Sequence, residues 1–233
     1  MIKTIFAGDV LIQENHEINY EESIQDVIDE CDIKCCNFEA PVITVEDKPI
    51  RKIGPNISQN ENACKIVEDM KFNLICLANN HICDYGYGPM GRTKDNFINA
   101  TTIGCGLSLD EIYKPYIYEK DGIRVGVFNI AETQFGCVDS IRISGYAWAF
   151  HKKTMEVIGD LKRKCDFIIA VVHAGLEDVD YPIPEWREFY RSLIDCGVTA
   201  VIGHHPHSVQ GYEEYHNGMI FYSLGNFIFT LIY

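Results

Sequence analysis

The sequence predicts a layered α/β protein in which helices pack on mixed β-sheets. Short apolar runs typical of buried strands alternate along the chain with amphipathic runs typical of helices. Two dipeptides, Asp121-Gly122 and Asn217-Gly218, match the two-residue turns of β-hairpins. No Gly/Ser-rich or Pro-rich linker interrupts the 233 residues, so we expect one domain over residues 1–233.

In the first half of the chain, apolar runs bounded by polar residues predict strands. These runs cover residues 3–12, 34–40, 72–79 and 101–106. Amphipathic runs predict helices at residues 20–32, 61–70 and 91–100. In the first of these helices, Ile24, Val27 and Ile28 fall on one face. Residues 41–60 are polar and irregular, and we expect a loop there.

In the second half, residues 113–131 predict a hairpin that turns at Asp121-Gly122. It is followed by a helix at 151–164, a strand at 166–175, a helix at 183–197, a strand at 198–205 and a hairpin turning at Asn217-Gly218. The sequence stops on the apolar run "LGNFIFTLIY", which leaves a truncated C-terminus open. An exposed apolar end would favour self-association.

The composition restricts the class of partner. A formal charge of −14, from 20 basic and 34 acidic residues, argues against nucleic acid, because phosphate backbones are bound by clustered Lys and Arg. The stretch "MIKTIFAGDV" lacks the features of a signal peptide, and no apolar run is long enough to span a membrane. We therefore expect no transmembrane segment and a cytoplasmic location. Envelope association is the alternative if the N-terminus was trimmed.

The ten cysteines include no C-x-x-C pair, and most lie in apolar segments such as "LICLA". Buried free thiols in a reducing compartment account for this pattern. A disulfide framework is not expected at this chain length.

Polar side chains follow the expected strands at their carboxyl ends, where ligands bind in sheets of this kind. A lone Asp after a glycine can cap a turn, and a lone His after an apolar strand can be a core residue. Five strands that each deliver such a residue to one edge predict a metal site instead. The residues are Asp9, Glu39, Asn80, His81, His173, His204, His205 and His207.

The residue types indicate which metals fit this edge. Carboxylate, carboxamide oxygen and neutral imidazole suit Mn, Fe or Zn, whereas Ca prefers oxygen ligands alone and structural Zn prefers Cys. The number of candidate ligands allows one or two divalent ions. Two ions can clamp both the attacking and the leaving oxygen of a displacement, so the site favours hydrolysis.

His204, His205 and His207 lie within four residues of one another. Neighbouring residues on an extended chain point to opposite sides, so these three side chains are not expected to face one metal together. His205 and His207 then share a face, and we expect both to bind metal. We expect His204 to lie outside the ligand set. The remaining histidines have no comparable setting and are expected to be solvated: His16, His151 and His216.

Six segments of the chain carry a family resemblance: "FAGDV", "NFEAPV", "LANNHICDYG", "VVHAGLE", "VIGHHPHSVQGYE" and "FYSLGNFIF". In order and approximate spacing they resemble the CapA capsule-synthesis family. This is the poly-γ-glutamate synthesis group, a branch of the calcineurin-like metallophosphoesterase superfamily. The segments cover nearly the whole chain, from Asp9 to Phe229.

The resemblance implies a four-layer α/β/β/α sandwich, with two sheets face to face and helices outside. It implies two metals bound by five short motifs. The matching ligands are Asp9, Glu39, Asn80, His173, His205 and His207. His81 or His173 would be the catalytic imidazole that assists the leaving group.

The chain departs from the family pattern at two positions. The usual Asp-x-His of the first motif reads Asp9-Val10-Leu11 here, so one imidazole ligand is absent. Glu39, with a longer reach, replaces the usual bridging Asp. We expect Asp84 to orient an imidazole rather than to bind the metal itself.

Two adjacent cations, Arg51 and Lys52, lie in the irregular loop near the expected site. In a chain of this charge they predict a binding site for an anionic small molecule or polymer, with Arg able to bind a carboxylate or phosphate through two bonds. A solvated loop is the alternative.

The residues and the resemblance together favour a metal-dependent hydrolase that uses a metal-activated water. Its substrate would be a phosphoester or an amide-linked anionic polymer such as poly-γ-glutamate. The alternative is a non-catalytic component that binds polymer or partner proteins of a capsule-synthesis machinery. The imidazole missing at Leu11 favours this alternative.

Overall fold

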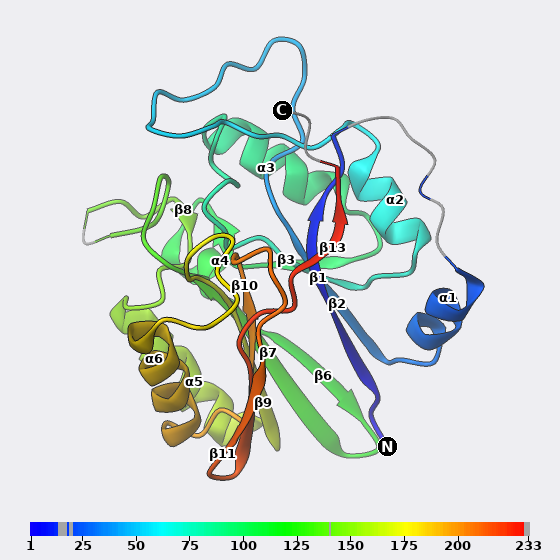
Figure 1. Cartoon of the computed structure of the whole chain (residues 1–233), viewed down its shortest axis with the longest axis vertical. Coiled ribbons are helices and arrows are strands. Elements are labelled where there is room, and N and C mark those ends of the chain that lie inside the picture. The colour runs from blue at the N-terminus through cyan, green and yellow to red at the C-terminus, as the bar shows by residue number, and fades with distance from the viewer. Residues whose placement is uncertain (14–17, 19–20, 140, 231–233) are drawn as a thin grey trace.

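Two β-sheets, of five and six strands, lie face to face and carry helices on their outer sides (Figure 1). The computed structural model describes residues 1–13, 18, 21–139 and 141–230. In Figure 1, α5 and α6 cover one side of the molecule, and α2 and α3 lie on the other. The expected α/β/β/α sandwich is confirmed.

The first sheet is entirely parallel and has the order β13-β1-β2-β3-β4. Its strands are β1 (Thr4–Leu11), β2 (Ile33–Phe38), β3 (Leu74–Cys76), β4 (Thr101–Ile103) and β13 (Asn226–Phe229). The helices between them are α1 (Glu22–Asp29), α2 (Ala63–Asp69) and α3 (Tyr87–Asn96). Parallel strands need such crossover connections, and their carboxyl ends all reach one edge.

The second sheet has the order β11-β12-β10-β9-β7-β6, with a parallel centre and an antiparallel pair at each margin. Its strands are β6 (Tyr116–Lys120), β7 (Ile123–Ala131), β9 (Phe167–His173), β10 (Ala200–His204), β11 (Tyr212–Tyr215) and β12 (Gly218–Phe221). Its helices are α5 (Lys152–Lys164) and α6 (Pro184–Asp195). A small side unit contains β5 (Cys105–Gly106), α4 (Leu109–Ile112) and β8 (Gly145–Tyr146).

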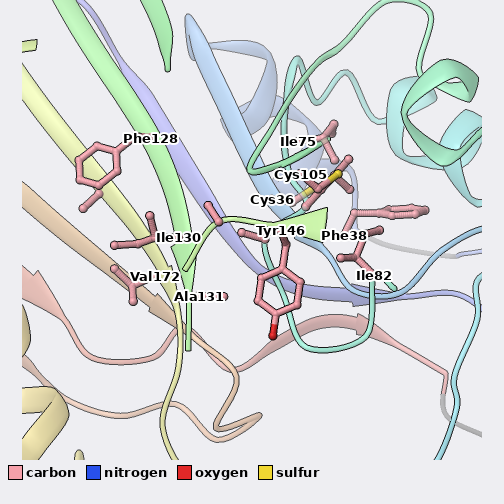
Figure 2. Close-up of a cluster of buried hydrophobic side chains, with 14 of the residues drawn as sticks. Cys36, Phe38, Ile75, Ile82, Cys105, Phe128, Ile130, Ala131, Tyr146 and Val172 are labelled. Carbon is pink, nitrogen blue, oxygen red and sulfur yellow. The ribbon is translucent and has the colours of Figure 1, made fainter. Parts of the chain in front are cut away.

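Successive side chains of a strand point to opposite faces of its sheet, so most of the buried apolar residues form two separate clusters. Cys35 belongs to the apolar cluster that joins the two sheets, whereas Cys36 belongs to the cluster that also contains the helices. The same alternation holds in β9, where Ile169 joins the inner cluster and Ala170 the outer one. Figure 2 shows part of the outer cluster, in which Tyr146 is fully buried.

Several elements differ from the sequence prediction at their boundaries. β3 ends at Cys76 rather than at residue 79, and the expected strand at 101–106 is broken at Gly104. Gly104 has φ 98°, and a Cβ there would overlap Oδ1 of Asn129, so only glycine fits. Helix α3 begins at Tyr87, four residues before the prediction at 91.

The last hairpin turns one residue earlier than the Asn217-Gly218 prediction. Tyr215 pairs with Gly218, so the loop consists of His216 and Asn217. A Cβ at Gly218 would lie 2.7 Å from Cδ1 of Ile194, which explains why the glycine occupies the strand rather than the loop. After this hairpin the chain crosses back, and β13 joins the first sheet beside β1.

All ten cysteines have free thiols, and most are buried. This agrees with the absence of a disulfide framework expected from their spacing. In the part of the chain that the structure describes, no helix is both long enough and apolar enough to cross a bilayer.

The pairing of β13 with β1 places Asp9 opposite Asn226. It depends on Gly8, because a Cβ at that position would overlap the carbonyl oxygen of Gly225. The backbone N–H of Asp9 donates to the same carbonyl at 2.9 Å. The position of Asp9 therefore depends on a close approach that only glycine permits.

Replacing Gly8 with Ala is expected to lower the free energy of unfolding by at least about 2 kcal/mol, because β13 must move away from β1. Gly91→Ala in α3 is the matched control, since its Cβ would meet nothing within 4 Å. That variant is expected to gain up to about 1 kcal/mol. Urea unfolding of both variants measures the difference, and equal stabilities would contradict the role of Gly8.

Candidate metal centre

The strand-end residues predicted from the sequence come together where the carboxyl edges of the two sheets meet. Asp9 lies in β1, Glu39 directly follows β2, and His173 is the last residue of β9. Asn80 follows β3 by four residues, and His204 ends β10. His173 and His204 are paired in register across β9 and β10. Elements far apart in sequence therefore supply one compact polar site.

Five of the six predicted ligands form two overlapping groups with metal-ligand spacing. Glu39, His173 and His205 form one group, and Asp9, Glu39 and His207 form the other. Within each group the potential ligand atoms lie within 4.8 Å of one another. Oδ1 of Asn80 lies 2.9 Å from Nε2 of His173 and so borders the first group. Glu39 is common to both groups, an arrangement that fits two cations sharing one carboxylate.

Glu39 shows that the site fits a cation. Its side chain is fully buried, and neither carboxylate oxygen has a hydrogen-bond partner in the part of the chain that the structure describes. Burial raises the pKa of Glu39 well above 4.5, and the negative charges of Asp9, Glu177 and Asp84 raise it further. A buried carboxylate without partners is unfavourable unless a cation neutralises it. Carboxylate and imidazole together suit Mn, Fe or Zn.

Asp9 is also fully buried, but its carboxylate has several partners. Its Oδ1 accepts hydrogen bonds from Nδ2 of Asn37 and Nδ1 of His204, both at 2.8 Å. Its Oδ2 accepts the backbone N–H of His205 at 3.3 Å. Burial acts to raise the pKa of Asp9, but His204, His207 and Asn37 outweigh it and lower the pKa below 3.8. Asp9 is thus held as the charged form that a cation requires.

His173 and His205 are buried imidazoles in contact, with 3.1 Å between Nε2 of His173 and Nδ1 of His205. Burial is the largest effect on each and lowers both pKa values, that of His205 to about 4. The other histidines of the site act in the same direction on His173. Both rings are therefore neutral near pH 7, the form in which imidazole binds a metal.

The reason given from the sequence for choosing His205 and His207 is wrong, because β10 ends at His204. Both histidines lie beyond the strand with positive φ, 96° for His205 and 57° for His207. Ala40, directly after Glu39, has φ 93°. Non-glycine residues rarely adopt this conformation, and such strain concentrates at functional sites. The strained backbone, rather than strand alternation, brings both imidazoles to the carboxylates.

His204 lies outside both ligand groups, and its Nδ1 is 2.8 Å from Oδ1 of Asp9. The isolated histidines have varied settings. Nδ1 of His151 accepts the N–H of Lys153 at the start of α5, so this ring is not simply solvated. His216 is exposed and lies 2.9 Å from Asp195. His16 lies outside the described residues.

A second cluster joins His81, Asp84 and Lys52 at the margin of the site. Nδ1 of His81 lies 2.6 Å from Oδ2 of Asp84, so this carboxylate orients the ring. Lys52 forms an ion pair with Oδ1 of Asp84, and its ammonium lies 3.3 Å from Nδ1 of His81. The Lys52 side chain is only 3% exposed, which limits its use as a substrate contact.

Beside the centre lies an open cavity of about 820 Å³. Glu39, Asn80, His81 and His207 line it, together with Lys52, Phe135 and Phe229. Arg51 is exposed and does not line the cavity, so the structure separates the two cations expected to bind substrate. His173 is fully buried and does not line the cavity either, which favours His81 for proton transfer to a substrate.

Comparison with known proteins now identifies the family. A family model described as "Bacterial capsule synthesis protein PGA_cap" matches residues 3–231. The chain belongs to this family. It is 27% identical over 251 residues to the PGA biosynthesis protein CapA of Bacillus subtilis, covering 98% of this chain and 63% of that protein. It is 29% identical over 203 residues to the capsule biosynthesis protein CapA of Bacillus anthracis, covering 83% of this chain and 49% of that protein.

The chain thus spans about half to two thirds of the length of these relatives.

Two solved structures share its fold. A putative 5'-nucleotidase from Staphylococcus aureus, in complex with alpha-ketoglutarate, superposes with a TM-score of 0.59 at 16% identity, covering 96% of this chain and 48% of that one. A hypothetical protein from Thermus thermophilus gives 0.53 at 14% identity, covering 96% and 76%. They support a metallophosphoesterase-like fold for this family member.

The sequence analysis missed residues that support the candidate ligands. Asn37 bonds Asp9 and lies 3.2 Å from Nδ1 of His173, and Asn226 of β13 lies 2.9 Å from Nδ1 of His207. Gln134 donates to Glu132 at 2.7 Å, and Glu132 lies 3.4 Å from Nε2 of His205. Glu132 follows β7, so its place after a strand was an available signal. Asn37 and Asn226 lie within strands, so their sequence positions carried no comparable signal.

Glu39→Gln tests whether this carboxylate needs a cation. Without added metal the variant is expected to unfold at a higher temperature than the parent, because a neutral amide is buried at lower cost than an unpaired charge. With Mn at one hundred times its Kd, the parent is expected to gain about 2.7 kcal/mol and the variant much less. Thermal unfolding and elemental analysis with and without Mn, Fe and Zn measure both effects. Glu61→Gln, an exposed change, is the control, and a parent that binds none of these metals would contradict the assignment.

Lys52→Met is expected to destabilise the protein by about 3–5 kcal/mol, because it leaves the Asp84 charge buried without its cation. Lys65→Met is the matched control, since its ion pair with Asp69 is exposed and contributes at most about 1 kcal/mol. Denaturant unfolding measures both. An unchanged stability for Lys52→Met, combined with weaker substrate binding, would return Lys52 to the substrate-contact role predicted from the sequence.

Proposed function

We propose that this PGA_cap family member is a metal-dependent hydrolase of the metallophosphoesterase type that acts on an anionic substrate of capsule or poly-γ-glutamate metabolism. The observation that carries the proposal is Glu39, a buried carboxylate that has no hydrogen-bond partner among the described residues and is common to two groups of candidate ligands. A binding surface for polymer alone would not require this unfavourable charge, whereas a centre of two cations does.

The candidate ligands divide between two cation positions. His173, His205 and Asn80 would hold one ion and Asp9 and His207 the other, with Glu39 between them. When bound, such cations supply Lewis acidity and lower the pKa of a coordinated water toward neutrality. His204 and Asn37 keep the Asp9 carboxylate in place, and Asn226 does the same for His207. These contacts fix ring and carboxylate orientation before a metal arrives.

His81 is the residue placed to move a proton. It lines the cavity, and Asp84 occupies its Nδ1, which leaves Nε2 for the substrate. Asn79 accepts the backbone N–H of His81 and donates to the carbonyl oxygen of Phe38, so the segment is fixed to the end of β2. A ring held at both its backbone and its Nδ1 can deliver a proton from Nε2 to a leaving oxygen or nitrogen.

The substrate class rests on the cavity and on the relatives. The cavity opens to solvent beside the carboxylates and imidazoles, and its volume admits the end of a polymer or a small phosphoester. The names of the curated relatives refer to PGA and capsule biosynthesis. Bond cleavage within such a pathway trims, releases or transfers polymer ends, so hydrolase chemistry and a biosynthetic role are compatible.

His81→Ala is expected to keep its metal and to lose turnover on the order of 10²- to 10⁴-fold, because it removes a positioned proton donor and no candidate ligand. Asp9→Ala is expected to lose metal and turnover together. The measurements are metal content and hydrolysis of a generic phosphodiester and of poly-γ-glutamate, with and without chelator. His216→Ala serves as the matched histidine control, since its ring contacts Asp195 away from the centre.

Loss of metal from His81→Ala would make that residue a ligand and contradict its role in proton transfer. A metal-loaded parent without turnover on either class of substrate would contradict the hydrolase. That result would instead support the non-catalytic alternative, in which the same fold binds polymer or a partner of the capsule-synthesis machinery.

A further inference from the structure

A second hollow adjoins the cavity of the candidate centre. It has a volume of about 460 Å³ and shares two lining residues, Gln134 and Phe135, with the larger cavity. Its other lining residues include Tyr87, Cys83 and Arg142. The two hollows are therefore neighbours that share one wall.

The wall between the hollows is firmly held. The backbone N–H of Gln134 donates to the hydroxyl of Tyr146 at 2.8 Å, and this hydroxyl donates to the carbonyl oxygen of Glu132 at 3.2 Å. Tyr146 is fully buried in the outer apolar cluster, where Figure 2 shows it. The side chain of Gln134 bonds Glu132 and lies 3.4 Å from Nδ2 of Asn80. Gln134 thus connects the second hollow directly to a candidate metal ligand.

Arg142 lines the second hollow, and most N–H groups of its guanidinium have no hydrogen-bond partner among the described residues. Among the residues that the structure describes, its guanidinium forms no ion pair; its one hydrogen bond runs from Nη1 to the carbonyl oxygen of Cys137 at 3.1 Å. The nearby carboxylate of Asp139 accepts the backbone N–H groups of Ile141 and Arg142 instead. Most other arginines pair with acids: Arg92, Arg124, Arg163, Arg187 and Arg191.

A guanidinium without an ion pair is notable in a chain of net charge −14, because acidic side chains are abundant. Arg51 also has no acidic partner among the described residues, but it lines neither hollow. Lys52 lines the larger cavity, but Asp84 already neutralises it. Arg142 is therefore the cation of this region with hydrogen-bond donors left for a ligand. A guanidinium binds planar carboxylates and phosphates through paired N–H groups.

We propose that Arg142 and the second hollow form a subsite for a second oxyanion of the substrate, one repeat away from the bond cleaved at the metal centre. The ligand class is an oligomeric anion with regularly spaced carboxylates or phosphates. This inference rests on the proposed function for the position of the reacting bond. It assigns Arg142, rather than Arg51 or Lys52, to substrate recognition.

The test is the affinity of the metal-loaded protein for short probes, measured by calorimetry so that turnover is not required. The probes are γ-glutamyl-glutamate and the same dipeptide with the carboxylates of its second residue amidated. Arg142→Ala is expected to weaken binding of the first probe roughly 10- to 100-fold, the effect of a charge-assisted hydrogen bond, and to leave the second probe unchanged. Arg142→Lys keeps the positive charge but not the paired N–H groups of a guanidinium. It is expected to bind the first probe more tightly than Arg142→Ala and more weakly than the parent.

Arg51→Ala is the matched control and is expected to bind both probes as the parent does. Metal content and thermal unfolding of each variant verify that the centre and the fold are intact. A parallel series with butane-1,4-diol bisphosphate, whose phosphorus atoms are as many bonds apart as the two α-carboxylates of the dipeptide, distinguishes phosphate from carboxylate as the bound group, and dependence on Arg142 in either series supports the subsite.

Equal affinity of parent and Arg142→Ala for every probe would overturn the inference, as would a parent that binds none of them. A larger loss in Arg51→Ala than in Arg142→Ala would also overturn it. None of these outcomes affects the hydrolase proposal, which is decided by metal content and turnover of the His81 and Asp9 variants.

Discussion

The architecture of the site follows from one electrostatic constraint, the burial of two carboxylates a short distance apart. Asp9 and Glu39 are both fully buried. Asp9 is stabilised by Asn37, His204 and the backbone of His205, whereas Glu39 has no hydrogen-bond partner among the described residues. Two buried like charges repel each other strongly unless positive charge lies between them. The buried imidazoles of His173 and His205 are neutral and placed as ligands, so a bound cation would supply the missing positive charge.

The position of Asn80 beside these carboxylates depends on a bond between the two sheets. Oδ1 of Asn129 in β7 accepts the backbone N–H of Ala78 at 2.6 Å, and its Nδ2 donates to Val171 of β9 at 3.2 Å. This side chain fastens the segment that follows β3, and thus Asn80, to the opposite sheet. The break at Gly104 makes room for it. A buried amide with both ends bonded fixes geometry more tightly than apolar packing alone.

The sequence predicted the layered fold and most of the candidate ligands, because strand periodicity and polar residues at strand ends are local signals. Asp9, Glu39, Asn80 and His173 were recognisable for that reason. The supporting residues were not, since Asn37 and Asn226 matter only through pairings with residues remote in sequence. Lys52 was recognised as a cation, but its burial against Asp84 depends on the fold of the loop. Gln134 and Arg142 gave no signal, because hollows arise only after the chain has folded.

The place of β13 in the first sheet has a consequence for the order in which the protein is made. This strand follows the other described strands in sequence, yet it pairs with β1, the first of them. During synthesis β1 therefore presents an unpaired edge until residues 226–229 have emerged, and such edges invite pairing with other chains. His207 also lacks its Asn226 partner until then. A nascent chain that has not yet reached β13 therefore cannot present the candidate ligands in their final geometry.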